Sequence, residues 1–255
     1  LRRKRTLNVE YHKMYSGRIG REMEFKSYGW GGKPVVVFPS SGGRFYEYED
    51  FGMTEACRPF IERGVIRLYT PDSIDRESWF ADAAPGDRAR RHNDYDGYIV
   101  DELVPFIKFH SGYGGGMIAT GCSMGGYHSV NFFFRHPDVF DTLIALSGIY
   151  DARFFTGDFG GDFDVYINSP VDYIAGMSDP WFLERYRQGN IIICTGQGAW
   201  EEDSIRDTMH MERVLGEKGI PAWVDYWGHD VDHDWPWWRV QMPCFLGVLE
   251  NQGKL

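Results

Sequence analysis

The stretch Met117-Ile118-Ala119-Thr120-Gly121-Cys122-Ser123-Met124-Gly125-Gly126 joins a short apolar run to a segment with helical spacing. It contains the pattern Gly-x-Ser-x-Gly at Gly121, Ser123 and Gly125. A nucleophilic serine on a tight turn from strand to helix needs small residues two positions before and after it, because larger side chains would clash where the chain reverses. The stretch therefore predicts a strand, a sharp turn and a helix, with Ser123 as a nucleophile. The alternative is a Gly-rich turn in which the serine only caps the helix.

Short apolar runs of strand length recur on both sides of this stretch. They lie at residues 35–38, 66–69, 117–120, 143–146, 191–194 and 223–226. Segments with helical spacing alternate with them, at residues 95–109, 126–135, 205–215 and 237–249. Buried strands that alternate with helices predict an α/β fold with a doubly wound, mostly parallel sheet and helices on both faces.

The beginning of the chain follows another pattern. Residues 7–15 and 21–28 are joined by five residues, which leaves no room for a helix, so we expect an antiparallel N-terminal hairpin. Residues 156–168 are rich in Gly, Asp and Phe without periodicity and predict a loop beside the sheet. No repeat or linker interrupts the sequence, and we expect a single domain over residues 1–255 without a separate lid domain.

Composition narrows the classes of function. The 27 Lys and Arg against 37 Asp and Glu give a formal charge of −10, which argues against a nucleic-acid partner held by phosphate neutralisation. No apolar run reaches the ~18 residues of a membrane span, and the basic residues 1–5 are not followed by the apolar part of a signal peptide. Residue 1 is Leu and not Met, so removal of an upstream segment stays open.

The cysteines give a second constraint. Cys57, Cys122, Cys194 and Cys244 are too few and too scattered for a disulfide scaffold or a CxxC metal site. We therefore expect free thiols and a location in the reducing cytoplasm.

An acid and a histidine follow Ser123 in the order that an α/β-hydrolase triad requires. The apolar run 191–194 leads into Glu201-Glu202-Asp203, and the run 223–226 leads into a loop that contains His229 and His233. Alternative explanations are the acidic first turn of a helix for the carboxylates and local hydrogen bonds for the histidines.

A metal site is a further alternative, because Asp230, Asp232 and Asp234 lie among the two histidines. In a loop rich in Gly and Asp we do not expect His229 and His233 to face one another as they would on a helix. We therefore expect neither a metal nor another cofactor.

Several segments together resemble the putative-esterase branch of the α/β-hydrolases, which holds esterase D-like enzymes, feruloyl and enterochelin esterases, and mycolyltransferases. They are residues 35–43, 75–79, 95–106, 121–126 and 233–238, and the resemblance runs from about residue 23 to residue 249. The resemblance implies an α/β-hydrolase fold and serine esterase chemistry. His-Asp-Trp-x-x-Trp at 233–238 looks like the catalytic-histidine segment of the family, which favours His233 over His229. Glu201 falls where mycolyltransferases have their acid, and Glu202 and Asp203 are the alternatives.

The backbone amide of Met124, directly after the nucleophile, is the first predicted donor to an oxyanion. The second donor should come from the loop after residues 35–38, where family members usually have His-Gly or Asp-Gly. This chain has Pro39-Ser40-Ser41-Gly42-Gly43 instead. Proline has no N–H, so Ser41 is the predicted donor and Ser40 the alternative.

Residues near these motifs predict a substrate pocket formed by Ser40, Tyr46, Trp79 and Trp235, with the segment from Arg153 to Asn168 on the leaving-group side.

The function predicted is that of a serine carboxylesterase, which hydrolyses a small or aryl ester through a Ser-His-Glu triad and an acyl-enzyme. The alternatives are an acyltransferase with the same triad and a catalytically inactive binding protein. We expect the partner to be a small-molecule ester and expect no association with a membrane. Association with further copies of the chain stays open.

Overall fold

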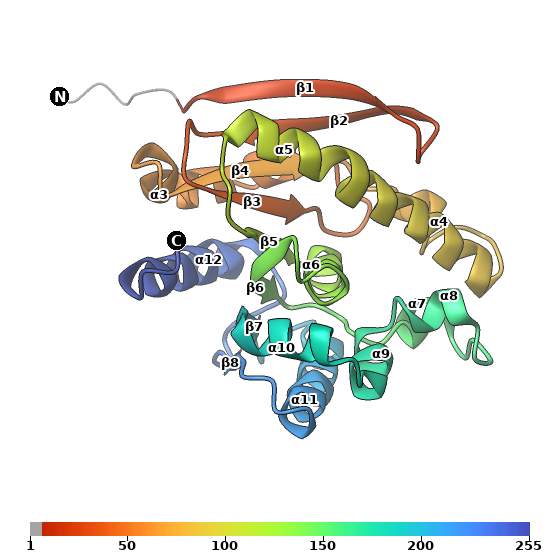
Figure 1. The fold of residues 1–255 in the computed structure, drawn as a ribbon. Coiled ribbons are helices and arrows are strands. Elements are labelled where there is room, and N and C mark those ends of the chain that lie inside the picture. The colour runs from red at the N-terminus through yellow and green to blue at the C-terminus, as the bar shows by residue number, and fades with distance from the viewer. Residues whose placement is uncertain (1–6) are drawn as a thin grey trace.

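Eight strands form one sheet in the computed structural model, which describes residues 7–255 (Figure 1). Their order across the sheet is β1-β2-β4-β3-β5-β6-β7-β8. The strands are β1 (Val9–Ser16), β2 (Arg21–Tyr28), β3 (Lys33–Phe38), β4 (Ile66–Pro71), β5 (Met117–Cys122), β6 (Phe140–Leu146), β7 (Asn190–Thr195) and β8 (Trp223–Tyr226). β1 pairs antiparallel with β2, β2 pairs antiparallel with β4, and all other neighbours are parallel. The predicted hairpin and mostly parallel sheet are confirmed, whereas the basic residues 1–5 lie outside the described residues.

Helices cover both faces of the sheet (Figure 1). They are α1 (Glu47–Asp50), α2 (Met53–Ala56), α3 (Arg58–Glu62), α4 (Pro85–Gly97), α5 (Val104–Ser111), α6 (Met124–Arg135), α7 (Arg153–Thr156), α8 (Phe163–Tyr166), α9 (Pro170–Gly176), α10 (Pro180–Gln188), α11 (Glu202–Glu217) and α12 (Trp235–Asn251). A 3₁₀-helix, η1 (Asp75–Glu77), follows β4, and a π-helix, η2 (Tyr98–Leu103), joins α4 to α5. Among the helices of residues 7–255, none combines the length and apolarity needed to span a bilayer.

β3 shows how the sheet divides the core. Val36 and Phe38 pack with the cluster under α4 to α6, whereas Val35 and Val37 pack with the cluster under α3 and α12. Successive side chains of a strand point to opposite faces, so an unbroken apolar run is what a strand covered on both sides needs.

Two predicted segments differ in detail from the structure. Residues 95–109 were expected as one regular helix but pass from α4 through the π-helix to α5, where Pro105 is present. Proline has no N–H for the regular helical ladder, which explains a change of hydrogen-bond pattern near this position. The predicted loop 156–168 contains the short α8, which the side chain of Asp162 caps by accepting the Val165 amide.

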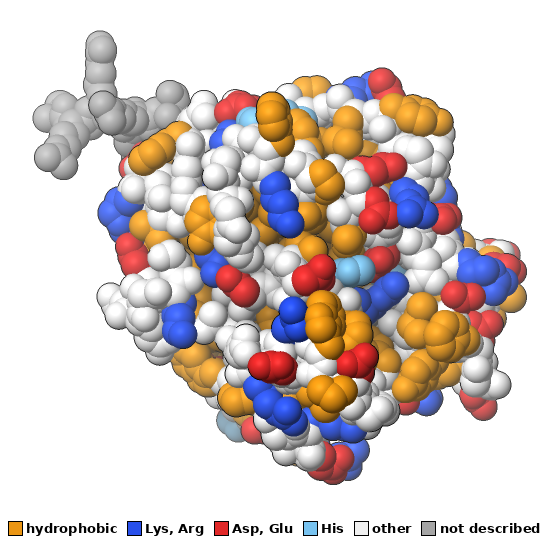
Figure 2. Space-filling view, in the orientation of Figure 1, with side chains coloured by type: hydrophobic (Ala, Val, Ile, Leu, Met, Phe, Trp, Pro, Cys, Tyr) orange, Lys and Arg blue, Asp and Glu red, His pale blue; other side chains and the backbone are white. Residues whose placement is uncertain are grey.

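Charged side chains of both signs are interspersed on the face in Figure 2, with apolar groups between them. Several charged side chains of the described chain form ion pairs between neighbouring elements, such as Lys13 with Glu22 and Lys26 with Glu49.

The turn from β5 into α6 places Ser123 in a strained backbone conformation, with φ of 57° and ψ of −119°. The glycines beside it permit backbones to approach closely. A Cβ on Gly121 would lie 2.6 Å from the Phe38 carbonyl oxygen, and one on Gly125 would lie 2.2 Å from the same atom. The predicted strand, turn and helix are therefore present, and they bring the end of β3 against the start of α6.

Gly125→Ala should destabilise the fold, because the new methyl group would overlap the Phe38 carbonyl group. We expect the free energy of unfolding to fall by about 1–3 kcal/mol, as for other overpacked sites, in urea denaturation. Gly216→Ala in α11 is the matched control, since a Cβ there meets nothing within 4 Å. It should leave stability unchanged or raise it slightly. Equal stability of the two variants would contradict this explanation of the turn.

Candidate active site

Three of the predicted side chains meet at the carboxyl edge of the parallel strands. His233 Nε2 lies 2.9 Å from Ser123 Oγ, and His233 Nδ1 lies 3.1 Å from Glu201 Oε2. Ser123 follows β5, Glu201 follows β7 and His233 follows β8. Parallel strands end at the same edge of a sheet, so residues 110 positions apart are brought into hydrogen-bond contact.

Glu201 is fully buried and hydrogen-bonded at both carboxylate oxygens. Oε1 accepts the Ser147 hydroxyl at 2.6 Å and the Gly196 amide at 3.2 Å, and Oε2 accepts the Thr195 hydroxyl at 3.1 Å. Burial opposes ionisation of this carboxyl, but the hydrogen bonds from His233 and Ser147 and the charge of His233 together lower its pKa below 4.5. Glu201 is thus held as a carboxylate beside the imidazole.

Ser147 is a site residue that the sequence analysis missed. Its backbone has a φ of 51°, and its Oγ accepts the Trp238 indole N–H at 3.1 Å while its hydroxyl donates to Glu201. The Trp238 ring in turn meets the His233 ring edge to face at 5.1 Å. The available signal was its position directly after the strand run 143–146, at the same edge of the sheet as Ser123.

The alternatives weighed for the acid and the histidine do not join this chain of hydrogen bonds. Glu202 and Asp203 are exposed in the first turn of α11, and Asp203 pairs with Arg206. His229 is exposed. The structure therefore brings Glu201 and His233, and not these neighbours, to Ser123.

Among the described residues, one group of side chains lies close enough together to hold a metal, and it includes neither His229 nor His233. Glu10, His12 and His110 gather on the N-terminal hairpin and α5. The guanidinium of Arg67 donates to Glu10 at 3.0 Å and lies 3.2 Å from His110 Nε2. A cation already occupies this cluster, which disfavours a metal there.

The residues of the two predicted oxyanion donors, Ser41 and Met124, line one cavity together with Ser123. Three amides around Ser41 are bonded: Ser40 N–H to Glu47, Gly42 N–H to Asp75, and Gly43 N–H to the Ser40 carbonyl. Within the described chain, the amides of Ser41 and Met124 donate to no acceptor. Met124 is the first residue of α6, where no preceding helical turn supplies a carbonyl. Both amides are therefore free to bind an oxygen in the cavity.

The cavity has a volume of about 160 Å³ and mainly apolar walls. Besides Ser41, Ser123, Met124 and His233, its walls are Phe80, Ile149, Phe154, Phe155, Trp200, Asp203 and Ser204. Trp200 is 82% exposed, so the rim is open to solvent. Its φ of 67°, rare for a bulky residue, turns the chain directly before Glu201.

The four residues predicted from sequence as the pocket do not line this cavity. Ser40 is held by Glu47 through its amide and hydroxyl, and Tyr46 lines a separate polar cavity of about 540 Å³. Trp79 is fully buried behind the wall, stacked on Phe155. Trp235 is buried as well, because it begins α12 and packs on Phe51 and Trp238. Nearness to a motif in sequence thus selected two residues that packing buries, Trp79 and Trp235, and two that face away from this cavity, Ser40 and Tyr46.

A family model described as "Putative esterase" matches residues 16–247. The chain belongs to this esterase family. The match extends from the end of β1 into α12 and thus includes every loop that supplies the site. The predicted resemblance is confirmed, and with it the assignment to carboxylic ester hydrolases. A comparison with curated proteins gives no match.

Solved structures similar to this esterase share its fold over nearly the whole chain. A ferulic acid esterase is 16% identical with a TM-score of 0.74, and the alignment covers 96% of this chain and 98% of that one. An S-formylglutathione hydrolase from Agrobacterium tumefaciens is 14% identical with a TM-score of 0.72, covering 95% and 96%. A fluorophosphonate-binding serine hydrolase of Staphylococcus aureus, FphF, is 16% identical with a TM-score of 0.68, covering 95% and 98%. The predicted α/β-hydrolase fold is confirmed.

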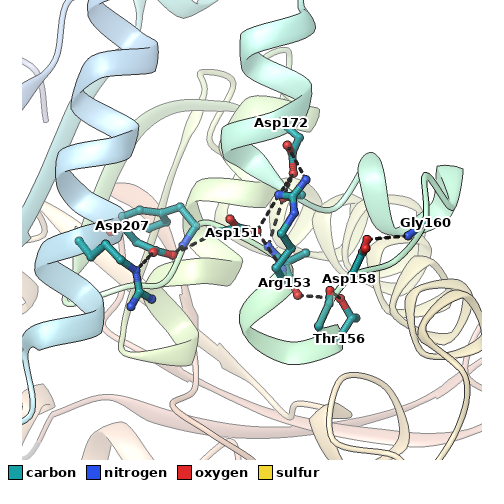
Figure 3. A network of polar contacts seen from close by, with 12 residues as sticks. Asp151, Arg153, Thr156, Asp158, Gly160, Asp172 and Asp207 are labelled. Carbon is teal, nitrogen blue, oxygen red and sulfur yellow. Dashed lines mark hydrogen bonds and ion pairs between the residues drawn. The ribbon is translucent and has the colours of Figure 1, made fainter.

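A polar network fixes the segment that carries the aromatic wall of the esterase (Figure 3). Asp207 of α11 accepts the amides of Tyr150 and Asp151 at 2.8 and 3.0 Å. Arg153 donates to Asp151 and, with two nitrogens, to Asp172 of α9. The guanidinium of Arg153 thus anchors α7, which presents Phe154 and Phe155 to the cavity; a place of this segment on the leaving-group side stays a prediction.

Glu201→Gln should reduce stability in a pH-dependent manner. Since the folded-state pKa of Glu201 is lowered, its ionised form contributes stability above about pH 4.5, and this contribution is lost as the pH falls through the folded-state pKa. We expect the variant to be less stable by about 1–3 kcal/mol at pH 7, and the difference to narrow below pH 4.5, in urea denaturation from pH 7 to pH 3.

Glu202→Gln is the control for this series, because Glu202 is the exposed neighbour. Its stability should stay within about 0.5 kcal/mol of that of the wild type throughout. A Glu201→Gln deficit that is the same at pH 3 as at pH 7 would contradict the lowered pKa.

Proposed function

We propose that this esterase is a serine carboxylesterase that hydrolyses small or aryl esters through Ser123, His233 and Glu201. The observation that carries the proposal is the chain of two hydrogen bonds from Ser123 Oγ through His233 to the buried Glu201 carboxylate. With Nδ1–H directed at Glu201, Nε2 is the nitrogen that can take the serine proton. The strained backbone of Ser123 supports the same role, because strain of this kind is concentrated at functional sites.

The reaction proceeds in two stages. Ser123 Oγ attacks the ester carbonyl carbon while His233 Nε2 accepts the hydroxyl proton, and the Ser41 and Met124 amides bind the oxyanion. Collapse of this intermediate breaks the ester bond, and the imidazolium gives its proton to the departing alcohol. Water then attacks the acyl-enzyme with His233 as base, which releases the acid and restores Ser123. Glu201 stabilises the imidazolium in both stages.

The cavity supports a small acyl group or a single aromatic ring as the bound part of the ester. Its volume is about 160 Å³, and the rings of Phe80, Phe154, Phe155 and Trp200 line it. Aromatic pairs gain from offset or edge contacts in addition to buried area. The similarity to a ferulic acid esterase, whose substrate name denotes an aryl acid, supports the aryl class.

The open rim gives water access to the acyl-enzyme, which hydrolysis requires. Trp200 and Phe154 at the rim are 82% and 52% exposed.

All four cysteines are free thiols, and three of them are buried, which supports the reducing cytoplasm as compartment.

Fluorophosphonate labelling tests the triad. The wild type should be labelled at Ser123, as located by mass spectrometry. Ser123→Ala should lose the label, and both Ser123→Ala and His233→Ala should lose p-nitrophenyl ester turnover by roughly 10⁴-fold or more. His229→Ala is the control, because His229 is an exposed histidine in the same loop. Its ester turnover should stay within about twofold of that of the wild type. Folded wild type without a label would contradict the proposal and favour a binding protein.

Product analysis separates hydrolysis from acyl transfer. With a p-nitrophenyl ester and a saturating alcohol or sugar acceptor, the free acid should remain the main product, because the rim admits water. Chromatography of acid and transferred ester gives the ratio. A predominance of the transferred ester would assign the same triad to an acyltransferase.

A further inference from the structure

One buried carboxylate connects the two segments that supply the oxyanion donors. Asp75 lies in η1 and is 1% exposed. Its Oδ2 accepts the amide of Gly42, the residue directly after Ser41, at 3.0 Å. Its Oδ1 lies 2.9 Å from Nε2 of His128, a fully buried residue of α6.

Asp75 joins the two segments because of where each of its partners lies in the chain. Met124 begins α6, and His128 follows it by about one helical turn. Asp75 therefore contacts the helix that holds one donor and the loop that holds the other. On the loop side, Glu47 adds a second anchor by accepting the Ser40 amide at 2.8 Å.

The contacts of Asp75 and His128 indicate no second role for these two side chains. His128 packs among the rings of Phe38, His92 and Tyr95, and its Nδ1 has no hydrogen-bond partner among the described residues. A buried carboxylate and imidazole are costly to desolvate, and apolar residues of similar size often serve packing equally well. The Gly42 amide is the contact that an apolar pair could not replace.

We propose that Asp75 and His128 form a positioning pair that sets the separation of the Ser41 and Met124 amides. This inference rests on the proposed esterase function, in which both amides bind the oxyanion. Neither side chain touches the substrate; the pair acts through the backbone of the loop and of α6. An amide displaced by about 1 Å loses much of its bond to the oxyanion, and such displacement costs up to about 10²-fold in rate.

Two variants of Asp75 separate the loss of its hydrogen bonds from the loss of its negative charge. Asp75→Ala removes both, whereas Asp75→Asn removes only the charge. Asn can still accept the Gly42 amide and donate to Nε2 of His128 in the Nδ1–H tautomer. We expect Asp75→Ala to lower kcat by about 10- to 100-fold with little change in KM, and Asp75→Asn to stay within about threefold. Affinity for a trifluoromethyl ketone, whose oxyanion adduct occupies both amides, should fall with kcat in Asp75→Ala.

Ser129→Ala is the matched control. Ser129 is a buried neighbour in α6, and its hydroxyl donates only to the Gly126 carbonyl. Its activity should stay within about twofold. The proposal is overturned if folded Asp75→Ala keeps full kcat, if Asp75→Asn is impaired equally, or if Ser129→Ala loses as much.

Hydrogen exchange separates this proposal from the esterase proposal. In Asp75→Ala, the peptide that contains residues 40–43 should exchange faster than in the wild type, by at least about tenfold, whereas α12 should be unchanged. Unchanged exchange in the loop would overturn the positioning pair even in an active esterase. Wild type that neither turns over esters nor binds the ketone would overturn the esterase function, while the exchange result would still test the connection.

Discussion

The close approach of two backbones at the end of β5 is the constraint on which the site depends. The Phe38 carbonyl lies so close to Gly125 that a Cβ there would be 2.2 Å away. Only glycine permits this contact. It brings α6 directly behind the loop after β3, so Met124 and Ser41 face one cavity. A larger residue would move α6 away from the loop after β3, and with it Ser123 and the Met124 amide away from the Ser41 amide.

Buried carboxylates hold the loops that this contact brings together. Glu201 accepts the Gly196 amide, Glu47 the Ser40 amide, and Asp207 the amides of Tyr150 and Asp151. Burial raises the pKa of Glu47 and Asp207, whereas hydrogen bonds and the charge of His233 bring that of Glu201 below its usual value despite burial. Of these three carboxyl groups, Glu201 is therefore the one whose ionised form the fold favours.

The sequence predicted the fold and selected the residues that meet at the strand ends, but it identified only part of the cavity wall: the segment that begins at Arg153 supplies Phe154 and Phe155, whereas Trp200 was not selected. Ser123, Glu201 and His233 could be found because each follows a recognisable strand, and the carboxyl ends of parallel strands converge. Trp200 could not, because its place at the rim depends on the path of the connection between β7 and α11, where its own backbone has a φ of 67°. Trp79 and Trp235 were selected for their nearness to motifs, yet local packing buries them. Ser147 shows that the strand-end rule could have been applied once more, after β6.

The Ser41 amide is where the hydrogen bonding of the oxyanion loop is left incomplete. Buried backbone amides are almost always bonded, and Ser40, Gly42 and Gly43 obey this rule through Glu47, Asp75 and a turn. Ser41 is exposed and its amide has no acceptor within the described chain, so water can reach it between turnovers. In the proposed mechanism, the substrate carbonyl oxygen replaces this water and becomes the oxyanion at a donor whose neighbours are already fixed. Little reorganisation is needed at the moment of reaction, which is the condition under which a single hydrogen-bond donor has its largest effect on rate.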